Sequence, residues 1–376
     1  MGIKDLFKVI EDECPEQLQT IPLTNLSGYR IAVDVSIYLY KYIRACGEKA
    51  WISAFITFLI TMKESGATLV LVADGPNTPP EKKLEQESRR AQTERSVNRM
   101  KECERLRKLI RDEYCETERA IDGQLRKECE ILIAAEKSQK GITVNYSDPF
   151  DVIQWLDVTG DRLKKQTMPI TERHRQIAED LFRMLGFAYI KADGEAEALC
   201  AYLAVDGQVD GVATEDTDVL AYGCPYMFCF KDLKLSAKQI HVLHLPSILG
   251  SMRLQYEEWR DLCILLECDY NARVVGFPPD GRQRKKAVGI GYKGAVAMIN
   301  EYRRLEVVCQ HVIDEGPLNY RRCRELFTVP GTIPIVHPYQ RPANVDEIEA
   351  FFKEHNVGIS IDYVLNAWKP PAMEFT

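Results

Sequence analysis

The stretches Ala192-Asp-Gly-Glu-Ala-Glu-Ala198 and Val212-Ala-Thr-Glu-Asp-Thr-Asp-Val-Leu220 decide how this chain is interpreted. They carry two pairs of carboxylates, each pair two residues apart: Glu195/Glu197 and Asp216/Asp218. Small or apolar residues surround both pairs, whereas a solvated surface normally mixes its acids with Lys and Arg. Acids without basic neighbours repel one another unless a cation neutralises them, and a divalent metal ion is a suitable cation. The two stretches therefore predict a magnesium site.

An acid at the end of an apolar run also occurs twice upstream. Arg30–Asp34 and Thr68–Asp74 each predict a short buried strand followed by Asp, and the helical run Trp51–Ser65 lies between them. This β-α-β order favours parallel strands joined by a right-handed crossover. Phe187–Lys191 and Val209–Thr214 predict two further strands, each followed by one of the acid pairs. Since ligands of open α/β sheets bind at the carboxyl ends of the strands, we expect the acids to meet there.

The spacing of Glu195 and Glu197 places a condition on this site. Residues i and i+2 of a regular helix point about 200° apart. Both acids can therefore serve one site only if they lie in the first turn of their helix or just before it.

Composition excludes several classes of protein. The 376 residues carry a formal net charge of −7, and the twelve cysteines are scattered without a C-x-x-C pair, which favours reduced thiols over zinc or disulfides. The apolar run Trp51–Met62 is too short to span a membrane, and the N-terminus lacks a signal-peptide pattern. We therefore expect an intracellular protein without a membrane partner. The acidic balance does not exclude nucleic acid, because local basic patches are averaged away.

The charged segment Glu81–Lys140 alternates acids and bases and has few large apolar residues. It allows two interpretations: a solvated pair of helices stabilised by i, i+4 ion pairs, or a mobile arm that contacts a polyanion. Gly141–Gly160 is interpreted as a connection or insertion. An amphipathic helix is expected over Thr171–Leu185.

Val288-Gly-Ile-Gly-Tyr-Lys-Gly-Ala295 follows a predicted helix at Leu254–Leu266 and leads into another at Val296–Arg304. Two helices around a glycine-bounded turn are typical of a helix-hairpin-helix phosphate binder. In such a turn, Gly289 and Gly291 would let backbone N–H groups approach a DNA phosphate. Four basic residues precede the turn: Arg282, Arg284, Lys285 and Lys286.

Together these motifs resemble, in order, the flap endonuclease (XPG-type) family of structure-specific 5′ nucleases. The resemblance spans Gly2 to about Tyr302, with a weaker similarity to Trp368. The motifs that carry it are Met-Gly-Ile at the start, Ile31-Ala-Val-Asp-Val-Ser36, Val72-Ala-Asp-Gly75, Gly194-Glu-Ala-Glu-Ala198, Ala213-Thr-Glu-Asp-Thr-Asp218, Asp261-Leu-Cys-Ile-Leu-Leu-Glu-Cys-Asp-Tyr270 and Gly289-Ile-Gly-Tyr-Lys-Gly-Ala295.

The resemblance implies an α/β fold with a mostly parallel central sheet flanked by helices (a PIN-like 5′ nuclease core), a helical arch insertion and a helix-hairpin-helix. It also implies two Mg²⁺ ions, with Mn²⁺ as a substitute, and a K⁺ ion at the hairpin. By similarity, one Mg²⁺ would be held by Asp34, Asp74, Glu195 and Glu197. The other would be held by Asp216, Asp218 and Asp269, with Glu195 shared. Two metal ions about 3.5 to 4 Å apart activate a water and stabilise both charged oxygens of an in-line displacement.

Basic and aromatic residues outside this acid set are expected to contact DNA. Tyr40 matches an aromatic on which a base stacks, although a core tyrosine is the alternative. Lys82 or Lys83 stands for the first basic residue at the arch entrance. The usual arginine falls near Gln86 or Glu87, which leaves Arg89 or Arg90. The remaining expected contacts are Gly2, Gly289, Gly291, Lys293, Arg284 and Lys285.

The sequence also departs from the family pattern. Ala120–Thr159 and Ala272–Lys286 look like insertions. Val345-x-x-Ile-x-x-Phe-Phe352 is similar to a sliding-clamp-binding box but lacks its glutamine, so an amphipathic helix packed on its own core is favoured and clamp binding stays open. A monomer is expected. The expected segments are 1–80 and 171–270 for the nuclease core, 81–170 for the arch, 271–310 for the hairpin with its basic loop, and 311–376 for a C-terminal segment packed on the core.

The expected function is a Mg²⁺-dependent 5′ nuclease that cuts 5′ flaps or other branched DNA. It would act in replication or repair, in the nucleus or at a cytoplasmic site of DNA replication. Alternatives within the family are a 5′ exonuclease or a bubble or gap endonuclease. A further alternative is an inactive scaffold, which the presence of all seven acids disfavours.

Overall fold

The structure, a computed structural model, describes residues 2–113, 120–121, 123–136, 144–271, 275–276, 288–311, 318–337 and 344–367. The chain divides into two units. The first comprises residues 1–41, 52–85 and 171–376, and the second comprises residues 42–51 and 86–170. The first unit holds the central sheet, and the second consists of helices.

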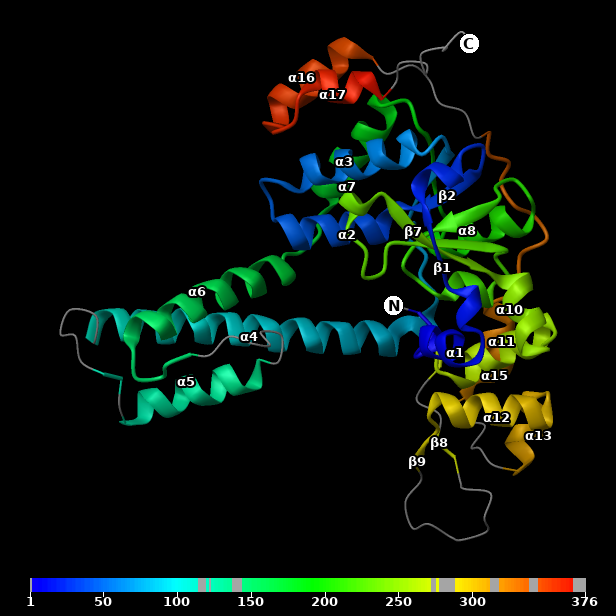
Figure 1. The fold of residues 1–376 in the computed structure, drawn as a ribbon, viewed down its shortest axis with the longest axis horizontal. Coiled ribbons are helices and arrows are strands. Elements are labelled where there is room, and N and C mark those ends of the chain that lie inside the picture. The colour runs from blue at the N-terminus through cyan, green and yellow to red at the C-terminus, as the bar shows by residue number, and fades with distance from the viewer. Residues whose placement is uncertain are drawn as a thin grey trace. The chain divides into compact units, whose positions relative to one another are not determined.

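Seven strands form one sheet in the order β1-β7-β6-β5-β2-β3-β4. Strands β1, β2 and β7 of this sheet are labelled in Figure 1. The bounds are β1 Gln19–Pro22, β2 Arg30–Asp34, β3 Thr68–Ala73, β4 Ala188–Lys191, β5 Gly211–Ala213, β6 Tyr226–Cys229 and β7 Gln239–His244. The strands from β6 to β4 pair in parallel, whereas β7 is antiparallel to both β6 and β1. The expected mostly parallel α/β sheet is confirmed. Strand β1 was not predicted.

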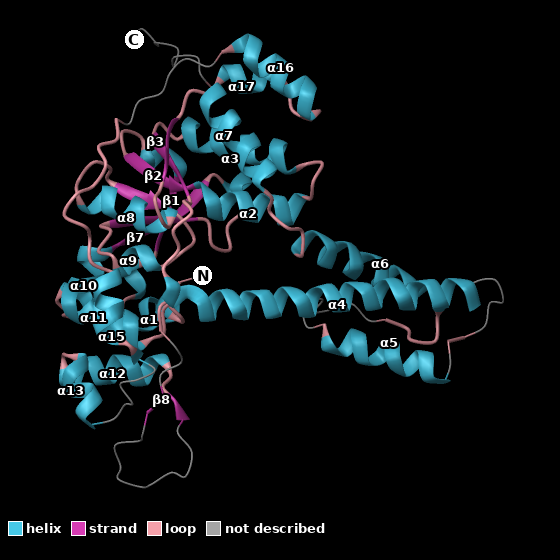
Figure 2. Cartoon of the chain, turned by 180° about the vertical axis from the view of Figure 1, so that it is seen from behind, coloured by secondary structure: helices cyan, strands magenta, loops and turns pink. Residues whose placement is uncertain are grey.

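Helices cover both faces of the sheet (Figure 2). α2 (Val35–Cys46), α3 (Trp51–Glu64) and α7 (Glu172–Met184) lie on one side, and α8 (Ala196–Val205) lies on the other with α9 (Asp218–Ala221). α8 packs on β2, β3 and β5. Its alanines let the helix approach the sheet closely, and almost the whole helix is buried. This close packing fixes the start of α8 beside the strand ends.

The first unit contains further helices among the described residues. They are α1 Leu6–Glu13, α10 Leu245–Met252, α11 Tyr256–Leu265, α12 Tyr292–Tyr302, α13 Leu305–His311, α15 Tyr320–Leu326, α16 Val345–His355 and α17 Ile361–Asn366. Short 3₁₀ turns lie at η1 Pro15–Gln17, η2 Leu23–Leu26, η3 Pro80–Lys82 and η4 Leu235–Ala237. A two-stranded ladder joins β8 (Val275–Gly276) to β9 (Val288–Gly289). Within the part of the chain that the structure describes, no helix is long and apolar enough to cross a membrane.

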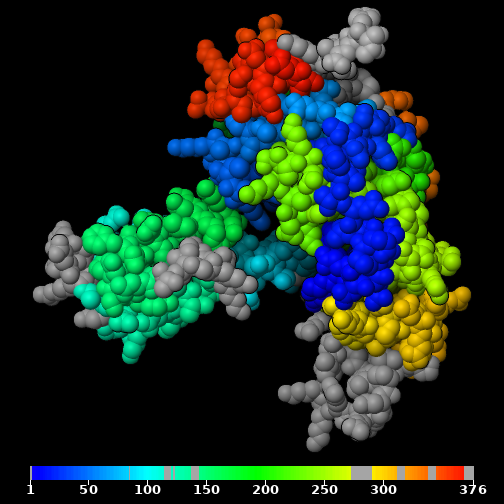
Figure 3. All heavy atoms as spheres, viewed as in Figure 1, coloured from blue at the N-terminus to red at the C-terminus, as the bar shows by residue number. Residues whose placement is uncertain are grey.

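α16 carries the segment that is similar to a clamp-binding box. Ile348, Phe351 and Phe352 are buried, and α16 contacts α7 and α17. Both C-terminal helices are visible at the surface in orange and red (Figure 3). The favoured interpretation, an amphipathic helix packed on its own protein, is confirmed.

The second unit is built from α4 (Lys83–Glu113), α5 (Gly123–Ala135) and α6 (Pro149–Gln166). Its core includes Leu106, Cys129 and Trp155, one residue from each helix. Of the two interpretations of Gly141–Gly160, the connection is wrong from Pro149 onward, because residues 149–160 lie in α6, and the insertion stays a prediction. Asp148 caps this helix by accepting a hydrogen bond from the Phe150 N–H at 2.9 Å, and Pro149 occupies its first position.

Candidate active site

The acids predicted from the sequence lie at the ends of neighbouring elements. Asp34 ends β2, Asp74 follows β3 and Asp216 follows β5, and these three parallel strands are adjacent in the sheet. Glu195 is the N-cap of α8 and Glu197 lies in its first turn, so the condition set by their spacing is met. Asp218 is the first residue of α9, and Asp269 follows α11.

Hydrogen bonds tie the first two acids to their neighbours. Asp34 accepts hydrogen bonds from the Ile37 N–H at 3.3 Å and from the Thr214 hydroxyl at 3.2 Å. Asp74 accepts one from the Ala196 N–H at 2.9 Å, which satisfies an open donor at the start of α8. The ends of β2, β3 and β5 and the start of α8 are therefore held together through their carboxylates.

Gly75 makes the approach of two acid-bearing loops possible. Its N–H donates to the Gly194 carbonyl at 2.7 Å. A Cβ atom at Gly75 would lie 2.0 Å from the Ala192 carbonyl oxygen, so only glycine fits between the two backbones. This contact brings the loop that carries Asp74 against the segment that carries Glu195.

Asp216 and Asp218 are buried on the other side of the cluster. The Asp216 N–H donates to the Thr214 hydroxyl and the Asp218 N–H donates to Asp216 Oδ1, both at 3.1 Å. Both carboxylate oxygens of Asp218 are buried without a hydrogen-bond partner among the described residues. An ionised carboxylate in that state is costly unless a cation approaches it.

Gly2 lies directly against this pair of acids. A Cβ atom at Gly2 would be 2.1 Å from Asp216 Oδ1 and 2.7 Å from Asp218 Oδ1, and the φ angle of Gly2 is +78°. Nearby, the Lys4 N–H donates to the Glu267 carbonyl at 3.0 Å and holds the N-terminal segment in place. The structure thus puts Gly2, which was expected to contact DNA, at the acid cluster itself.

A lysine lies among the acids. Lys82 Nζ contacts Glu195, lies 2.9 Å from Glu197 Oε1 and 3.3 Å from Asp269 Oδ2, and lies 5.4 Å from the centre of the Tyr270 ring. Lys82 is only 6% exposed. Burial alone would lower its pKa, but Glu197 and Glu195 raise the pKa of Lys82 above its ordinary value. Of the two candidates, Lys82 joins the cluster, whereas Lys83 is exposed at the start of α4.

The electrostatics of the acids show how crowded they are. Burial, together with the nearby Glu197, raises the pKa of Glu195 to about 7 and that of Asp216 to about 6. Burial also raises the pKa of Asp34 and of Asp218 well above the ordinary value. As the described side chains stand, no three acids, histidines or cysteines form a ligand group for one metal ion. The cation among these acids is the Lys82 ammonium group.

The residues expected to contact DNA lie on several different elements of the chain. Tyr40 is only partly buried, whereas Tyr38 is in the core, and Arg175 donates to the Tyr40 hydroxyl at 3.5 Å. Tyr40 is therefore not a core tyrosine. Arg89 and Arg90 are exposed on α4 and belong to the second unit.

The hairpin differs in detail from its prediction. Gly289 pairs with Val275 in the short ladder, and Gly291 is the N-cap of α12. The helix begins at Tyr292 and not at Val296, because the extended Gly291 backbone already initiates it. Lys293 is 77% exposed in its side chain and lies 3.5 Å from Asp12. Arg284 and Lys285 lie outside the described residues.

Sequence reasoning missed three polar residues that organise the site. Thr214 joins Asp34 to the Asp216 backbone, Tyr270 donates to Glu195, and Tyr222 contacts Tyr270. Thr214 and Tyr270 each lie within two residues of a predicted acid, which is a usable signal. No sequence signal pointed to Tyr222, which is 48 positions from Tyr270.

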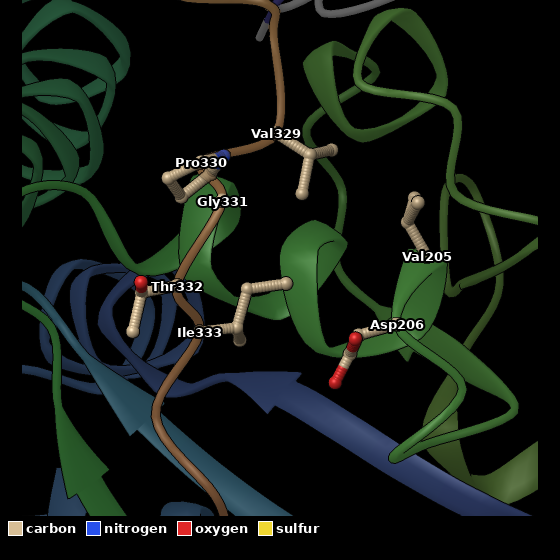
Figure 4. A pocket seen from close by; sticks show the side chains of 7 residues that line it. All are labelled: Val205, Asp206, Val329, Pro330, Gly331, Thr332 and Ile333. Atoms are coloured by element: carbon tan, nitrogen blue, oxygen red, sulfur yellow. The ribbon is translucent and has the colours of Figure 1, made fainter.

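A separate pocket of about 410 Å³ lies between the end of α8 and the segment 329–333 (Figure 4). Val205 and Asp206 line it on one side, and Val329, Pro330, Gly331, Thr332 and Ile333 line it on the other. None of the seven acids lines this pocket, so it is distinct from the candidate active site.

Two family descriptions match this chain: "XPG N-terminal domain" over residues 1–97 and "XPG I-region" over residues 186–269. Flap endonuclease 1 of Phytophthora infestans is 26% identical over 405 residues, which covers 98% of this chain and 87% of that protein. A probable RAD2-like endonuclease of Invertebrate iridescent virus 3 is 24% identical over 399 residues, which covers 100% of this chain and 99% of that protein.

Solved structures share the fold. The catalytic core of Rad2 in complex with DNA substrate has a TM-score of 0.60 at 17% identity, covering 98% of this chain and 99% of that chain. Flap endonuclease-1 from Methanococcus jannaschii has a TM-score of 0.55 at 18% identity, covering 94% and 95%. All seven clustered acids fall within the two matched segments. The chain therefore belongs to the XPG-type flap endonuclease family and is a nuclease that hydrolyses DNA phosphodiester bonds.

Proposed function

We propose that this nuclease is Mg²⁺-dependent, acts by a two-metal mechanism and cuts 5′ flaps or related branched DNA near the junction. The observation that carries the proposal is the buried carboxylate cluster at the ends of β2, β3 and β5, with the two partnerless oxygens of Asp218. Carboxylate oxygens are the donors that Mg²⁺ prefers, and the donor set contains no thiolate or imidazole that would favour a softer metal.

The acids would divide between two ions as the resemblance implies. Asp34, Asp74, Glu195 and Glu197 would hold one, and Asp216, Asp218 and Asp269 would hold the other. When bound, the ions supply charge neutralisation at the scissile phosphate and a water of lowered pKa. Mn²⁺ would substitute for Mg²⁺, and the hairpin at α12 would take a K⁺ ion while its backbone N–H groups contact a phosphate.

The protein's own groups prepare the site for this chemistry. Thr214 and the N–H of Ala196 fix the orientation of Asp34 and Asp74, so that little rearrangement is needed when charge develops. Lys82 holds positive charge next to Glu195 and Glu197 inside a buried cluster. In that surrounding its ammonium group would also attract the phosphate that is cut.

Duplex binding would use Tyr40 and Arg175 on the first unit and Arg89 or Arg90 on α4. We place the protein, as a monomer, at an intracellular site of DNA replication or repair. No clamp partner is proposed, because Ile348, Phe351 and Phe352 of the candidate box are buried.

Product mapping tests this function. End-labelled duplexes that carry a 5′ flap, a nick, a gap or a bubble of the same sequence are incubated with the protein and Mg²⁺. We expect the flap to be cut fastest, within a few nucleotides of the junction. Single-nucleotide products from the nick would instead assign a 5′ exonuclease, and preferential bubble or gap cutting would assign the other family activity. Intact DNA that is nevertheless bound would refute the nuclease proposal.

A further inference from the structure

Behind the acid cluster, two buried tyrosines form a chain of hydrogen bonds that ends on Glu195. The Tyr270 hydroxyl donates to Glu195 Oε2 at 2.8 Å. The Tyr222 hydroxyl lies 2.7 Å from the Tyr270 hydroxyl. Tyr270 is 3% exposed and Tyr222 is 2% exposed, so water does not compete for either contact.

The direction of these bonds follows from the number of protons. Glu195 contacts the Lys82 ammonium group, and an ionised carboxylate only accepts hydrogen bonds. Tyr270 has one hydroxyl proton and gives it to Glu195. The proton between the two tyrosines must therefore come from Tyr222, whose hydroxyl donates to the Tyr270 oxygen. A phenol that accepts a hydrogen bond is a stronger donor itself, since such bonds reinforce one another along a chain.

The ring of Tyr222 is packed between aromatic neighbours, and its hydroxyl also shares a hydrogen bond with Tyr202. Tyr202 packs on it edge-on with ring centres 5.4 Å apart, and Phe327 does so at 5.0 Å. Phe327 also packs on Tyr270, at 5.2 Å. A phenylalanine at position 222 would keep all of this packing and remove only the hydroxyl. Packing therefore does not account for the hydroxyl, whereas its hydrogen bonds do, and the one to Tyr270 leads to Glu195.

The two carboxylate oxygens of Glu195 have different partners. Oε2 is engaged by Tyr270, and Oε1 faces Lys82 Nζ. The ring of Tyr270 lies under the same ammonium group, at 5.4 Å from its centre. Tyr270 thus positions both the carboxylate and the lysine, and Tyr222 restrains Tyr270.

We propose that Tyr222 is a positioning residue of the active site, which acts through Tyr270 to keep Glu195 oriented with Oε1 toward the reacting groups. The inference rests on the proposed function in that Glu195 is taken to serve the metal-dependent reaction. Outer partners that orient metal-binding side chains typically contribute about 10- to 100-fold to activity or metal affinity. Tyr222 acts one residue further out, so the lower end of that range applies.

The first test compares Tyr222→Phe with the wild type in steady-state cleavage of a 5′-flap duplex with Mg²⁺. We expect kcat to fall about tenfold with KM unchanged. Tyr256→Phe is the matched control, because it also removes one hydroxyl hydrogen bond, to the Ala221 carbonyl at 2.8 Å, without touching the chain to Glu195. An equal kcat in Tyr222→Phe and wild type, or an equal loss in Tyr256→Phe, would overturn the proposal.

A double-mutant cycle separates positioning from a general structural effect. If Tyr222 acts only through the Tyr270 hydroxyl, then Tyr222→Phe should cost nothing further in a protein that already carries Tyr270→Phe. Additive losses in kcat would show that Tyr222 acts by another route and would contradict the proposal.

A third measurement does not depend on cleavage. In protein labelled with 3-fluorotyrosine, the Tyr270 resonance is identified by its loss in Tyr270→Phe. Tyr222→Phe should shift that resonance, whereas Tyr256→Phe should leave it in place. An unchanged resonance in Tyr222→Phe overturns the positioning inference even if the enzyme is active. A shifted resonance in a protein that cuts no branched DNA would instead support the tyrosine chain and refute the proposed function.

Discussion

Replacing Lys82 by methionine tests whether this buried cation neutralises the acid cluster. Methionine fills a similar volume without charge, so the change removes the ammonium group while keeping most of the packing. Lys82 is 6% exposed and contacts Glu195, Glu197 and Asp269, so solvent screens the loss very little. Removing one partner of a buried ion pair costs about 3 to 5 kcal/mol. Uptake of a proton by Glu195, whose pKa is already raised to about 7, would offset part of that cost.

The assay is urea unfolding at pH 8 in the presence of a chelator, followed by far-UV circular dichroism. Lys83→Met is the matched control, since Lys83 is the exposed neighbour and its substitution should change stability by no more than about 0.5 kcal/mol. We expect the Lys82→Met midpoint to fall well below that of the control, and added Mg²⁺ to raise it more than it raises the wild type. A Lys82→Met protein as stable as the control would refute the role given to this ammonium group.

Three further predictions follow from the same cluster. Thr214→Val keeps the shape of the side chain but removes the hydroxyl that joins Asp34 to the Asp216 backbone. The free energy of unfolding should fall by about 1 to 3 kcal/mol, and cleavage should slow with little change in DNA affinity. Unchanged cleavage and stability would contradict this. Gly2→Ala should slow cleavage strongly, because its Cβ would lie 2.1 Å from Asp216 Oδ1. Gly28→Ala is the control: its backbone strain is similar (φ +84°), but no atom lies within 4 Å of the added Cβ, so cleavage should not slow. Because the pKa of Glu195 in the folded protein is raised from 4.5 to about 7, its contribution to stability is present below pH 4.5 and is lost as the pH rises through 7. Urea unfolding of the metal-free protein at a series of pH values should show this loss of stability. Glu195→Gln should make the stability less dependent on pH in this range.

The parts of the fold that the sequence predicted are those with strong local patterns. β2 and β3 are continuous apolar runs, so their place in the interior of a parallel sheet follows from burial on both faces. β1 escaped prediction because it is short and mostly exposed, and its strand conformation depends on pairing with β7, in which Thr20 lies opposite His241. The segment Gly141–Gly160 was interpreted as a connection because it contains Pro149, whereas Pro149 begins α6, a helix that is stabilised by packing within the second unit.

The candidate site, too, was predicted only where the sequence carries a strong local pattern. Six of the acids could be predicted because bare carboxylates after strands form an unusual pattern, and Asp269, which follows α11, because its motif resembles that of the family. The choice between Lys82 and Lys83 could not be made, since it depends on the 3₁₀ turn Pro80–Lys82 that aims one side chain inward. The role of Tyr222 could not be predicted either, because its partner Tyr270 becomes a neighbour only when α9 and the end of α11 pack together.

The most direct test of the central claim is single-turnover cleavage of a 5′-flap duplex by wild type and by Asp216→Asn in Mg²⁺, with DNA affinity measured in Ca²⁺. Asparagine keeps the shape of Asp216 and removes one negative charge from the buried cluster. We predict that the cleavage rate falls by about 100-fold or more, because even indirect metal partners contribute about 10- to 100-fold, while DNA affinity stays within about threefold. Cleavage by Asp216→Asn at the wild-type rate would contradict the assignment of these acids to a metal-dependent active site.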